Sequence, residues 1–153
     1  MIVYRVCSSK YSDNISGESS RKQRSNRWNS YGTPMLYTSD SPALCAVEMY
    51  QYIPPSFVPL DYSLLKIEIP DADPLLVDGS FFTDPNWIYN TKTTQSIGDY
   101  FINENKYLIM KVPSAMITDH CFNYLINPMH EDFKEVKILE TLSFPVDGKL
   151  FNR

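Results

Sequence analysis

Alternating apolar and polar positions divide much of the chain into short β-strands. A period of two is typical of a strand with one buried face. Residues 62–70 (YSLLKIEIP) show it clearly, because leucine and isoleucine alternate there with Lys66 and Glu68. This pattern and a few short apolar runs predict five strands: residues 2–7, 34–39, 62–70, 107–113 and 135–142.

Capping and breaking residues predict two helices between these strands. The sequence Asp-Ser-Pro at residues 40–42 can cap and start a helix, and the two prolines at residues 54–55 end it near Ile53. A second, short helix is predicted within residues 94–106, closed by a turn near Asn105.

The first predicted helix carries a glutamate beside its apolar face. Leu44, Val47 and Gln51 fall on one side at helical spacing, and Glu48 lies on or next to that stripe. A carboxylate at this place needs a partner, unless it sits at the rim and reaches water as a lone helical glutamate commonly does.

The order of elements predicts an α+β fold. Strand, loop, strand, helix, strand, helix, strand and strand follow one another, with too few helices for a doubly wound parallel sheet. We expect one domain over residues 1–153 with a mixed, mostly antiparallel sheet. The polar segment 8–30 is predicted to be a loop, and long loops in compact domains are usually functional or disordered. Residues 71–90 are predicted to be loop with helical turns.

The charge balance argues against polyanionic partners. Fourteen Lys and Arg against 18 Asp and Glu give a formal net charge of −4, so the field of the whole molecule does not attract nucleic acid or an anionic membrane. Three cysteines, Cys7, Cys45 and Cys121, match no CxxC spacing and indicate reduced thiols. No secretory signal or bilayer-spanning stretch is recognised. We expect a cytoplasmic protein without direct nucleic-acid or membrane contact.

Several common catalytic motifs are missing. The sequence has neither GxxxxGK[ST] nor GxGxxG, which excludes a P-loop and a Rossmann turn. Ser114 lies in VPSAM rather than GxSxG, which disfavours a serine hydrolase. His120 adjoins Cys121 and His130 stands apart, a poor pattern for zinc. No metal is therefore expected.

Six polar residues at element ends, in loops or in the first helix remain as candidates for a site: Arg5, Arg27, Tyr37, Glu48, Ser114 and Asn127. Arginine suits forked recognition of phosphate, so the two arginines indicate an anionic, phosphate-bearing ligand. A tyrosine ring can stack on a planar base. Taken singly, each of the six also has an ordinary structural explanation, such as core packing or capping of a strand.

A single glutamate can support one kind of glycosidic cleavage. Without a second carboxylate, Glu48 cannot run the acid and base pair of an ordinary glycosidase. It can stabilise a cationic sugar, and a carboxylate about 4 Å from an oxocarbenium centre gains roughly 4 kcal/mol at intermediate dielectric, worth about three decades in rate. A ribosyl pyridinium such as the nicotinamide riboside of NAD needs no leaving-group acid.

Motifs in the same order along the chain resemble those of the RES domain family. Tyr-Arg at residues 4–5 is followed by SNRWNSYGTPMLYTS at 25–39 and by CAVE at 45–48, where the family shows A-x-x-E. Later come VPSA at 112–115 and NYLINPMHEDF at 123–133. The resemblance covers almost the whole chain. It departs from the family in the two glycines usual before the arginine and in the alanine usual in A-x-x-E.

The resemblance implies a toxin of a bacterial toxin–antitoxin pair, with a fold similar to that of ADP-ribosylating toxins, that cleaves the nicotinamide–ribose bond of NAD. NAD would be a substrate, and no cofactor is implied. The acceptor of the ribosyl group is left open between water, phosphate and a protein. The implied partner is an antitoxin with a helix-turn-helix DNA-binding domain, and a homodimer within the complex is compatible with the family.

The family roles carry over to the six positions. Arg5 and Arg27 would hold the diphosphate and ribose, and Tyr37 would pack against the nicotinamide end. Glu48 would stabilise the cationic transition state. Two further residues would hydrogen-bond in the pocket: Ser114 and Asn127.

Two other functions stay open at this point. The chain could be a catalytically silent module of the same fold that binds NAD or a nucleotide. It could also bind nucleic acid through a basic cluster in the polar loop, although the acidic balance disfavours this reading. That cluster comprises Arg21, Lys22, Arg24 and Arg27.

Overall fold

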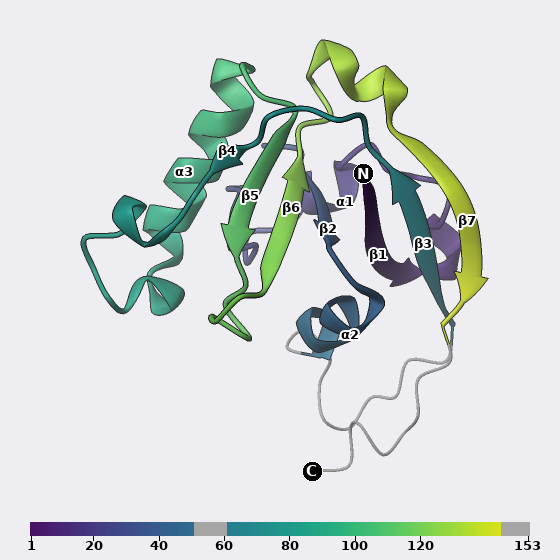
Figure 1. Ribbon diagram of the computed structural model, residues 1–153, viewed down its shortest axis with the longest axis horizontal. Coiled ribbons are helices and arrows are strands. Elements are labelled where there is room, and N and C mark those ends of the chain that lie inside the picture. Colours follow the sequence, from purple (N-terminus) through teal and green to yellow (C-terminus); the bar gives the residue numbers. More distant parts are fainter. Residues whose placement is uncertain (51–60, 145–153) are drawn as a thin grey trace.

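A computed structural model describes residues 1–50 and 61–144. These residues form one seven-stranded sheet in the order β4-β5-β6-β2-β1-β3-β7 (Figure 1). All neighbours pair antiparallel except β4 and β5, which are parallel. The strands are β1 Ile2–Ser8, β2 Leu36–Ser39, β3 Tyr62–Glu68, β4 Leu75–Leu76, β5 Ile109–Pro113, β6 Phe122–Ile126 and β7 Lys137–Ser143. The expected α+β class with a mixed, mostly antiparallel sheet is confirmed.

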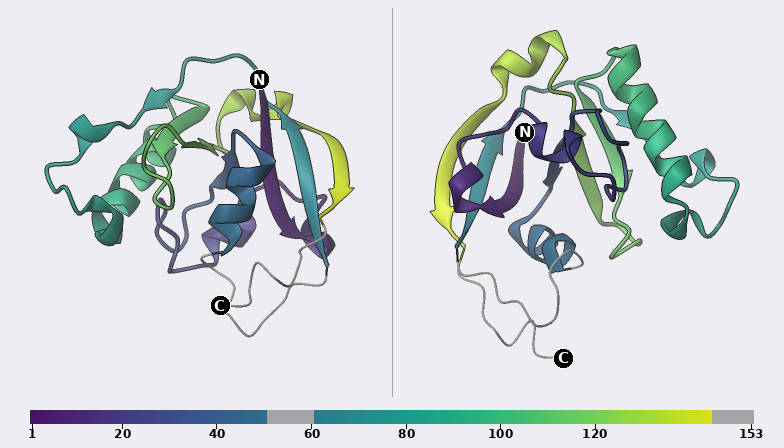
Figure 2. Two further views of the ribbon diagram at one scale, coloured as in Figure 1. Left: turned by 60° about the horizontal axis from the view of Figure 1, so that its bottom comes forward. Right: turned by 180° about the vertical axis from the view of Figure 1, so that it is seen from behind.

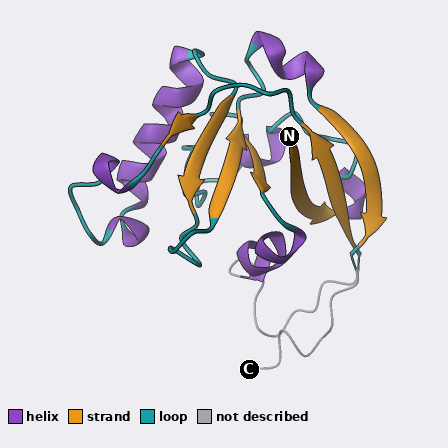
Figure 3. Cartoon of the chain, in the orientation of Figure 1, coloured by secondary structure: helices purple, strands orange, loops and turns teal. Residues whose placement is uncertain are grey.

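The helices lie around this sheet as Figure 3 shows. Three are α-helical: α1 Glu18–Arg21, α2 Pro42–Tyr50 and α3 Thr91–Glu104. Four are short 3₁₀ turns: η1 Ser9–Tyr11, η2 Gly79–Phe81, η3 Trp87–Tyr89 and η4 Glu131–Glu135. Seen from behind, the polar segment with α1 crosses one face of the sheet, and α2 lies near the end of β2 (Figure 2).

Two elements of the sheet escaped the sequence pattern. The five predicted strands are present, but β4 and β6 were not predicted. β4 has two residues, too few to show a period. β6 reads FNYLI, in which Asn123 interrupts the apolar run. The predicted loop 8–30 also contains the short α1, and the helical turns expected within 71–90 are η2 and η3.

Local capping explains where the helices begin and end. The Ser41 hydroxyl accepts from the Leu44 N–H at 3.2 Å, as expected for a cap of α2. The Asn90 side chain accepts from Thr93 N–H at 3.3 Å and begins α3, and Asn105 ends it in the left-handed conformation at φ 52°, which confirms the expected turn. The end of the first helix near Ile53 lies outside the described residues.

An apolar core lies on each face of the sheet. In β5, Ile109 belongs to one core and Met110 and Val112 to the other, because successive side chains point to opposite faces. The second core includes Phe101 of α3 and Trp28 of the polar segment. This packing presses α3 against the loop that carries Arg27. None of the helices in the described part of the chain has the length and apolar character to cross a bilayer.

Candidate active site

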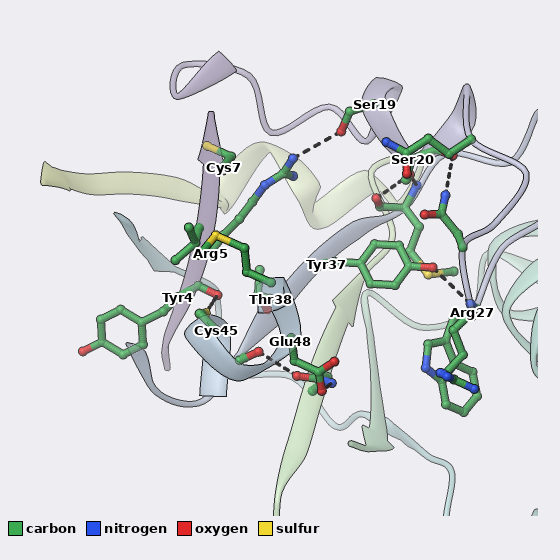
Figure 4. Close-up of a pocket in the computed structure, with 18 of the residues that line it drawn as sticks. Tyr4, Arg5, Cys7, Ser19, Ser20, Arg27, Tyr37, Thr38, Cys45 and Glu48 are labelled. Carbon is green, nitrogen blue, oxygen red and sulfur yellow. Dashed lines mark hydrogen bonds between the residues drawn. The ribbon is translucent and has the colours of Figure 1, made fainter. Parts of the chain in front are cut away.

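A pocket of about 570 Å³ opens between the polar segment, β1, β2, α2 and β6 (Figure 4). Its volume is in the range of sites for small molecules and cofactors. Among the described residues that line it, the only charged side chains are Arg5, Arg27 and Glu48. Tyr37 lines it as well. Four of the six predicted site residues therefore share one pocket, although they come from four different segments.

Glu48 is half-buried on α2, and its carboxylate is held by two hydrogen bonds from residues outside that helix. The Ser114 hydroxyl donates to Glu48 Oε1 at 2.6 Å, and the Asn123 amide nitrogen donates to the same oxygen at 2.7 Å. Hydrogen bonds to a charged acceptor are stronger than neutral ones. The carboxylate thus has a fixed orientation, set by residues 66 and 75 positions away along the chain. From the sequence, Glu48 could also have been a solvated side chain at the edge of the apolar face of its helix. The structure instead gives its carboxylate two protein partners.

Ser114 is fully buried and its hydroxyl has a defined direction. Its Oγ accepts from the backbone N–H groups of Met116 and Ile117, each at 3.1 Å. With the acceptor side engaged by two donors, the hydroxyl hydrogen goes to Glu48. Ser114 therefore orients the Glu48 carboxylate by a hydrogen bond, although it is not itself among the residues that line the pocket. Its neighbour Ala115 lines the pocket.

Arg5 projects from β1 into the pocket and is largely desolvated. Burial lowers the pKa of its guanidinium below the ordinary value, an effect only partly offset by the neighbouring Cys7 and Cys45. Its Nη2 donates to the Ser19 hydroxyl at 3.2 Å. Within residues 1–50 and 61–144 no carboxylate forms an ion pair with Arg5. The site therefore contains a poorly hydrated positive charge with neutral neighbours, which is a favourable place for an anion.

Two thiols lie beside this guanidinium and both are protonated at neutral pH. Burial raises the pKa of Cys45 to about 11, and burial also raises the pKa of Cys7. The Cys45 thiol donates to the Tyr4 carbonyl at 3.2 Å. Neither cysteine has the low pKa of a nucleophile.

Arg27 lies in a loop that α3 holds against the sheet. The Thr94 hydroxyl donates to the Arg27 carbonyl at 2.6 Å, and Gln95 donates to the Asn26 carbonyl at 2.6 Å. The guanidinium itself donates to the Ile88 carbonyl. Gly98 is required here, since an added Cβ would lie 1.6 Å from the Trp28 carbonyl oxygen. The loop geometry thus depends on close contact with the helix.

Tyr37 has its hydroxyl engaged with the same loop. The hydroxyl accepts from the Trp28 backbone N–H at 3.1 Å and donates to the Asn29 side-chain oxygen at 2.6 Å. Its ring lines the pocket. Tyr37 therefore fixes the position of the residue next to Arg27, a structural contribution that the sequence motif did not indicate.

Asn127 is not brought to this pocket. Its side chain is fully buried, donates to Asn105 Oδ1 at 2.8 Å and accepts from the Met129 N–H at 2.9 Å. These contacts join the end of β6 to the turn that ends α3. The pocket-lining residues do not include it, so a direct contact with substrate has no support in this geometry.

Asn123 is the site residue that the sequence did not single out. It lines the pocket and bonds Glu48, yet it lies on the strand that the pattern missed. The available signal was its place as the first residue of the quoted NYLINPMHEDF motif. Across the described ranges, no three His, Cys, Asp or Glu side chains gather in a way that could hold a metal ion.

Several known proteins are similar to this chain over nearly its whole length. Toxin Res of Pseudomonas putida is 32% identical over 153 residues, covering 99% of this chain and 100% of its own. A protein named Prs ADP-ribosylating toxin, from Sphingobium, is 26% identical and covers 92% of this chain and 89% of its own. Among solved structures, the M. tuberculosis MbcT–MbcA toxin–antitoxin complex contains a chain with TM-score 0.72 at 18% identity, covering 98% of this chain and 86% of that one.

That structural likeness supports the fold alone, because the identity is low. The family model for the RES domain matches residues 2–147. With this match and the Pseudomonas relative taken together, the chain belongs to the RES domain family.

Proposed function

We propose that the protein is the toxin of a toxin–antitoxin pair and consumes NAD by cleaving its nicotinamide–ribose bond. The observation that carries the proposal is one pocket with two arginines that form no ion pair within the described ranges and an oriented carboxylate, Glu48. The names of its relatives, a Toxin Res and an ADP-ribosylating toxin, support the same activity class.

The arginines supply the binding energy for an anionic dinucleotide. Burial has already removed much of the hydration of Arg5, so a diphosphate oxygen that reaches it gains a charged hydrogen bond at little further desolvation cost. Arg27 stands in a loop fixed by α3 and offers a second guanidinium. The Tyr37 ring provides a planar surface beside it for the nicotinamide end.

The chemical step needs a negative charge more than a proton donor. When the C1′–N1 bond of the nicotinamide riboside breaks, the electron pair leaves with the pyridinium nitrogen, which becomes neutral without being protonated. The ribose is left as an oxocarbenium ion, and Glu48 stabilises its positive charge. An acceptor oxygen then bonds to C1′ and loses its proton to solvent. An attraction confined to the transition state raises the rate rather than tightening substrate binding.

Release of free nicotinamide tests the proposal directly. The purified protein is incubated with NAD, alone and then with phosphate or with host protein as acceptor, and nicotinamide and the ribosyl product are identified by mass. Glu48→Gln keeps the shape and removes the charge, and should lower the rate by about three decades. The matched control is Glu104→Gln, which removes an exposed carboxylate at the end of α3 and should leave the rate unchanged.

The same experiment decides the alternative function. Binding of NAD without nicotinamide release under any of the three acceptor conditions would identify a catalytically silent binding module. The product mass distinguishes free ADP-ribose, a phosphorylated sugar and a modified protein, which the pocket geometry alone does not separate.

We further propose a cytoplasmic antitoxin with a helix-turn-helix domain as the partner, covering the mouth of the pocket. Met116 and Ile117 support this, because they are 39% and 42% exposed in the turn directly after Ala115, which lines the pocket. Co-expression with the product of the neighbouring reading frame should give a stable complex with no nicotinamide release. Light scattering of that complex would determine whether the toxin is present as a homodimer.

A further inference from the structure

Asn123 occupies a bridging position in the sheet below the pocket. It lies on β6 and is paired in register with Ser39 of β2 on one side and with Val112 of β5 on the other. Its Oδ1 accepts from the Ser39 hydroxyl at 2.6 Å, and its Nδ2 donates to Glu48 Oε1 at 2.7 Å. One side chain therefore connects a strand residue to the carboxylate on α2.

The direction of this amide follows from the chemistry of its neighbours. An ionised carboxylate can only accept hydrogen bonds, so the face of the amide towards Glu48 must be the NH₂ group. The Ser39 hydroxyl, which can donate, then faces the carbonyl oxygen. A flipped amide would put two acceptors together at Glu48. Ser39 is 4% exposed, so water does not compete readily for its hydroxyl.

From this arrangement we propose that Asn123 is a positioning residue for catalysis: held by Ser39, it orients the Glu48 carboxylate towards the breaking glycosidic bond. The inference rests on the proposed function, because it assigns Asn123 a part in the same reaction. Ser114 holds the same oxygen from the end of β5. Two donors on one oxygen, Asn123 from β6 and Ser114 from the position directly after β5, restrict rotation of the carboxylate more than either does alone.

The amide has properties that near replacements lack. Aspartate keeps the shape and can still accept from Ser39, but it removes the donor and puts a second negative charge beside Glu48. Alanine removes the donor without adding charge. A residue that only fills space would be replaced well by aspartate, whereas a donor would not.

Steady-state kinetics with NAD separate these roles. Asn123→Ala should lower kcat by about 10- to 100-fold, the range expected for loss of a hydrogen bond to a charged group, and leave KM within roughly twofold because the loss falls on the transition state. Asn123→Asp should lower kcat at least as much and also raise KM, since the added charge opposes an anionic substrate. Asn14→Asp, which adds the same charge at an exposed turn, is the control.

A double-mutant cycle distinguishes positioning from simple damage to the fold. In a Glu48→Gln background no charge remains to be oriented, so adding Asn123→Ala should change the residual kcat by less than about twofold. A purely structural defect would multiply the loss in both backgrounds. Wild-type kcat in a folded Asn123→Ala protein, or full additivity in the cycle, would overturn the proposal.

Two further outcomes are separable. If Asn123→Ala fails to fold, as judged by near-ultraviolet circular dichroism, Ser39→Ala replaces it, since it removes only the hydroxyl that orients the amide. It should lower kcat by about threefold or more, and an unchanged kcat would refute the inference. If wild-type protein releases no nicotinamide with any acceptor, the proposed function itself fails and the role of Asn123 fails with it.

Discussion

Tyr37 fixes the position of Trp28, since its hydroxyl accepts the Trp28 backbone N–H at 3.1 Å. The same hydroxyl donates to Asn29 at 2.6 Å. Arg27 directly precedes Trp28, so a strand residue that lines the pocket also sets the backbone from which one of the two pocket guanidinium groups extends. The lining of the pocket and the geometry of the loop are coupled through a single phenol.

Removing that phenolic oxygen should loosen the loop while keeping the ring. In Tyr37→Phe the Trp28 N–H loses its acceptor, and we expect the free energy of unfolding to fall by about 1–2 kcal/mol. The KM for NAD should rise, because the loop that carries Arg27 loses one of the contacts that fix its position. Urea unfolding and kinetics measure the two effects. Tyr100→Phe, at an exposed position of α3, should change neither, and an unaltered KM in Tyr37→Phe would contradict the coupling.

The contact between α3 and the Arg27 loop leaves no room for a side chain at Gly98. Gly98→Ala places a Cβ 1.6 Å from the Trp28 carbonyl oxygen, so helix and loop must separate. We expect a loss of about 3 kcal/mol in stability and weaker NAD binding. Gly79→Ala has open space around its Cβ and is the matched control, within about 0.5 kcal/mol of wild type. Thermal unfolding and calorimetric NAD titration give both quantities.

We expect Arg5 to lower the free energy of unfolding of the protein when no substrate is bound. Its burial without a carboxylate partner among the described residues opposes folding, so Arg5→Met is expected to leave the free energy of unfolding unchanged or raise it by about 1–2 kcal/mol. The same change should abolish measurable NAD binding. Arg21→Met, at an exposed ion pair with Glu18, should alter stability by less than about 1 kcal/mol and spare binding. A large destabilisation by Arg5→Met would show that the guanidinium supports the fold.

Cys45 gives the protein an alkaline pH dependence of defined sign. Burial raises its pKa in the folded state from 9.0 to about 11, so the folded protein holds this proton more tightly than the unfolded chain. The associated stability is fully present below pH 9 and is lost as the pH rises from about 9 to about 11. Cys45→Ala should therefore lose less stability than wild type over this window, by up to about 2 kcal/mol. Parallel curves in thermal unfolding would refute this assignment.

The sequence predicted the residues of the pocket better than the way they are held. Arg5, Arg27, Tyr37 and Glu48 belong to motifs that are local in sequence, and motifs of that kind can be recognised directly. The supports of these residues are non-local. The hold of Thr94 on the Arg27 loop spans 67 positions, and no periodicity records such a contact.

Asn123 and Asn127 show that a sequence motif does not reveal which of its polar side chains lines the pocket. Both belong to the same motif, four residues apart, and both are polar residues within or after an apolar run. The unpredicted β6 puts Asn123 against Glu48, while Asn127 lies beyond the strand end and bonds the turn after α3. The register of β6 determines which asparagine lines the pocket. That register is set by the pairing of β6 with β2 and β5.

The long sequence separation between Glu48 and its two hydrogen-bond donors has a consequence for synthesis of the chain. Glu48 leaves the ribosome long before Ser114 and Asn123, which follow it by 66 and 75 positions. A nascent chain that has exposed only its first half carries the carboxylate without the groups that aim it. The arrangement that orients Glu48 is therefore completed late in synthesis, only after β6 has paired with β2 on one side and β5 on the other.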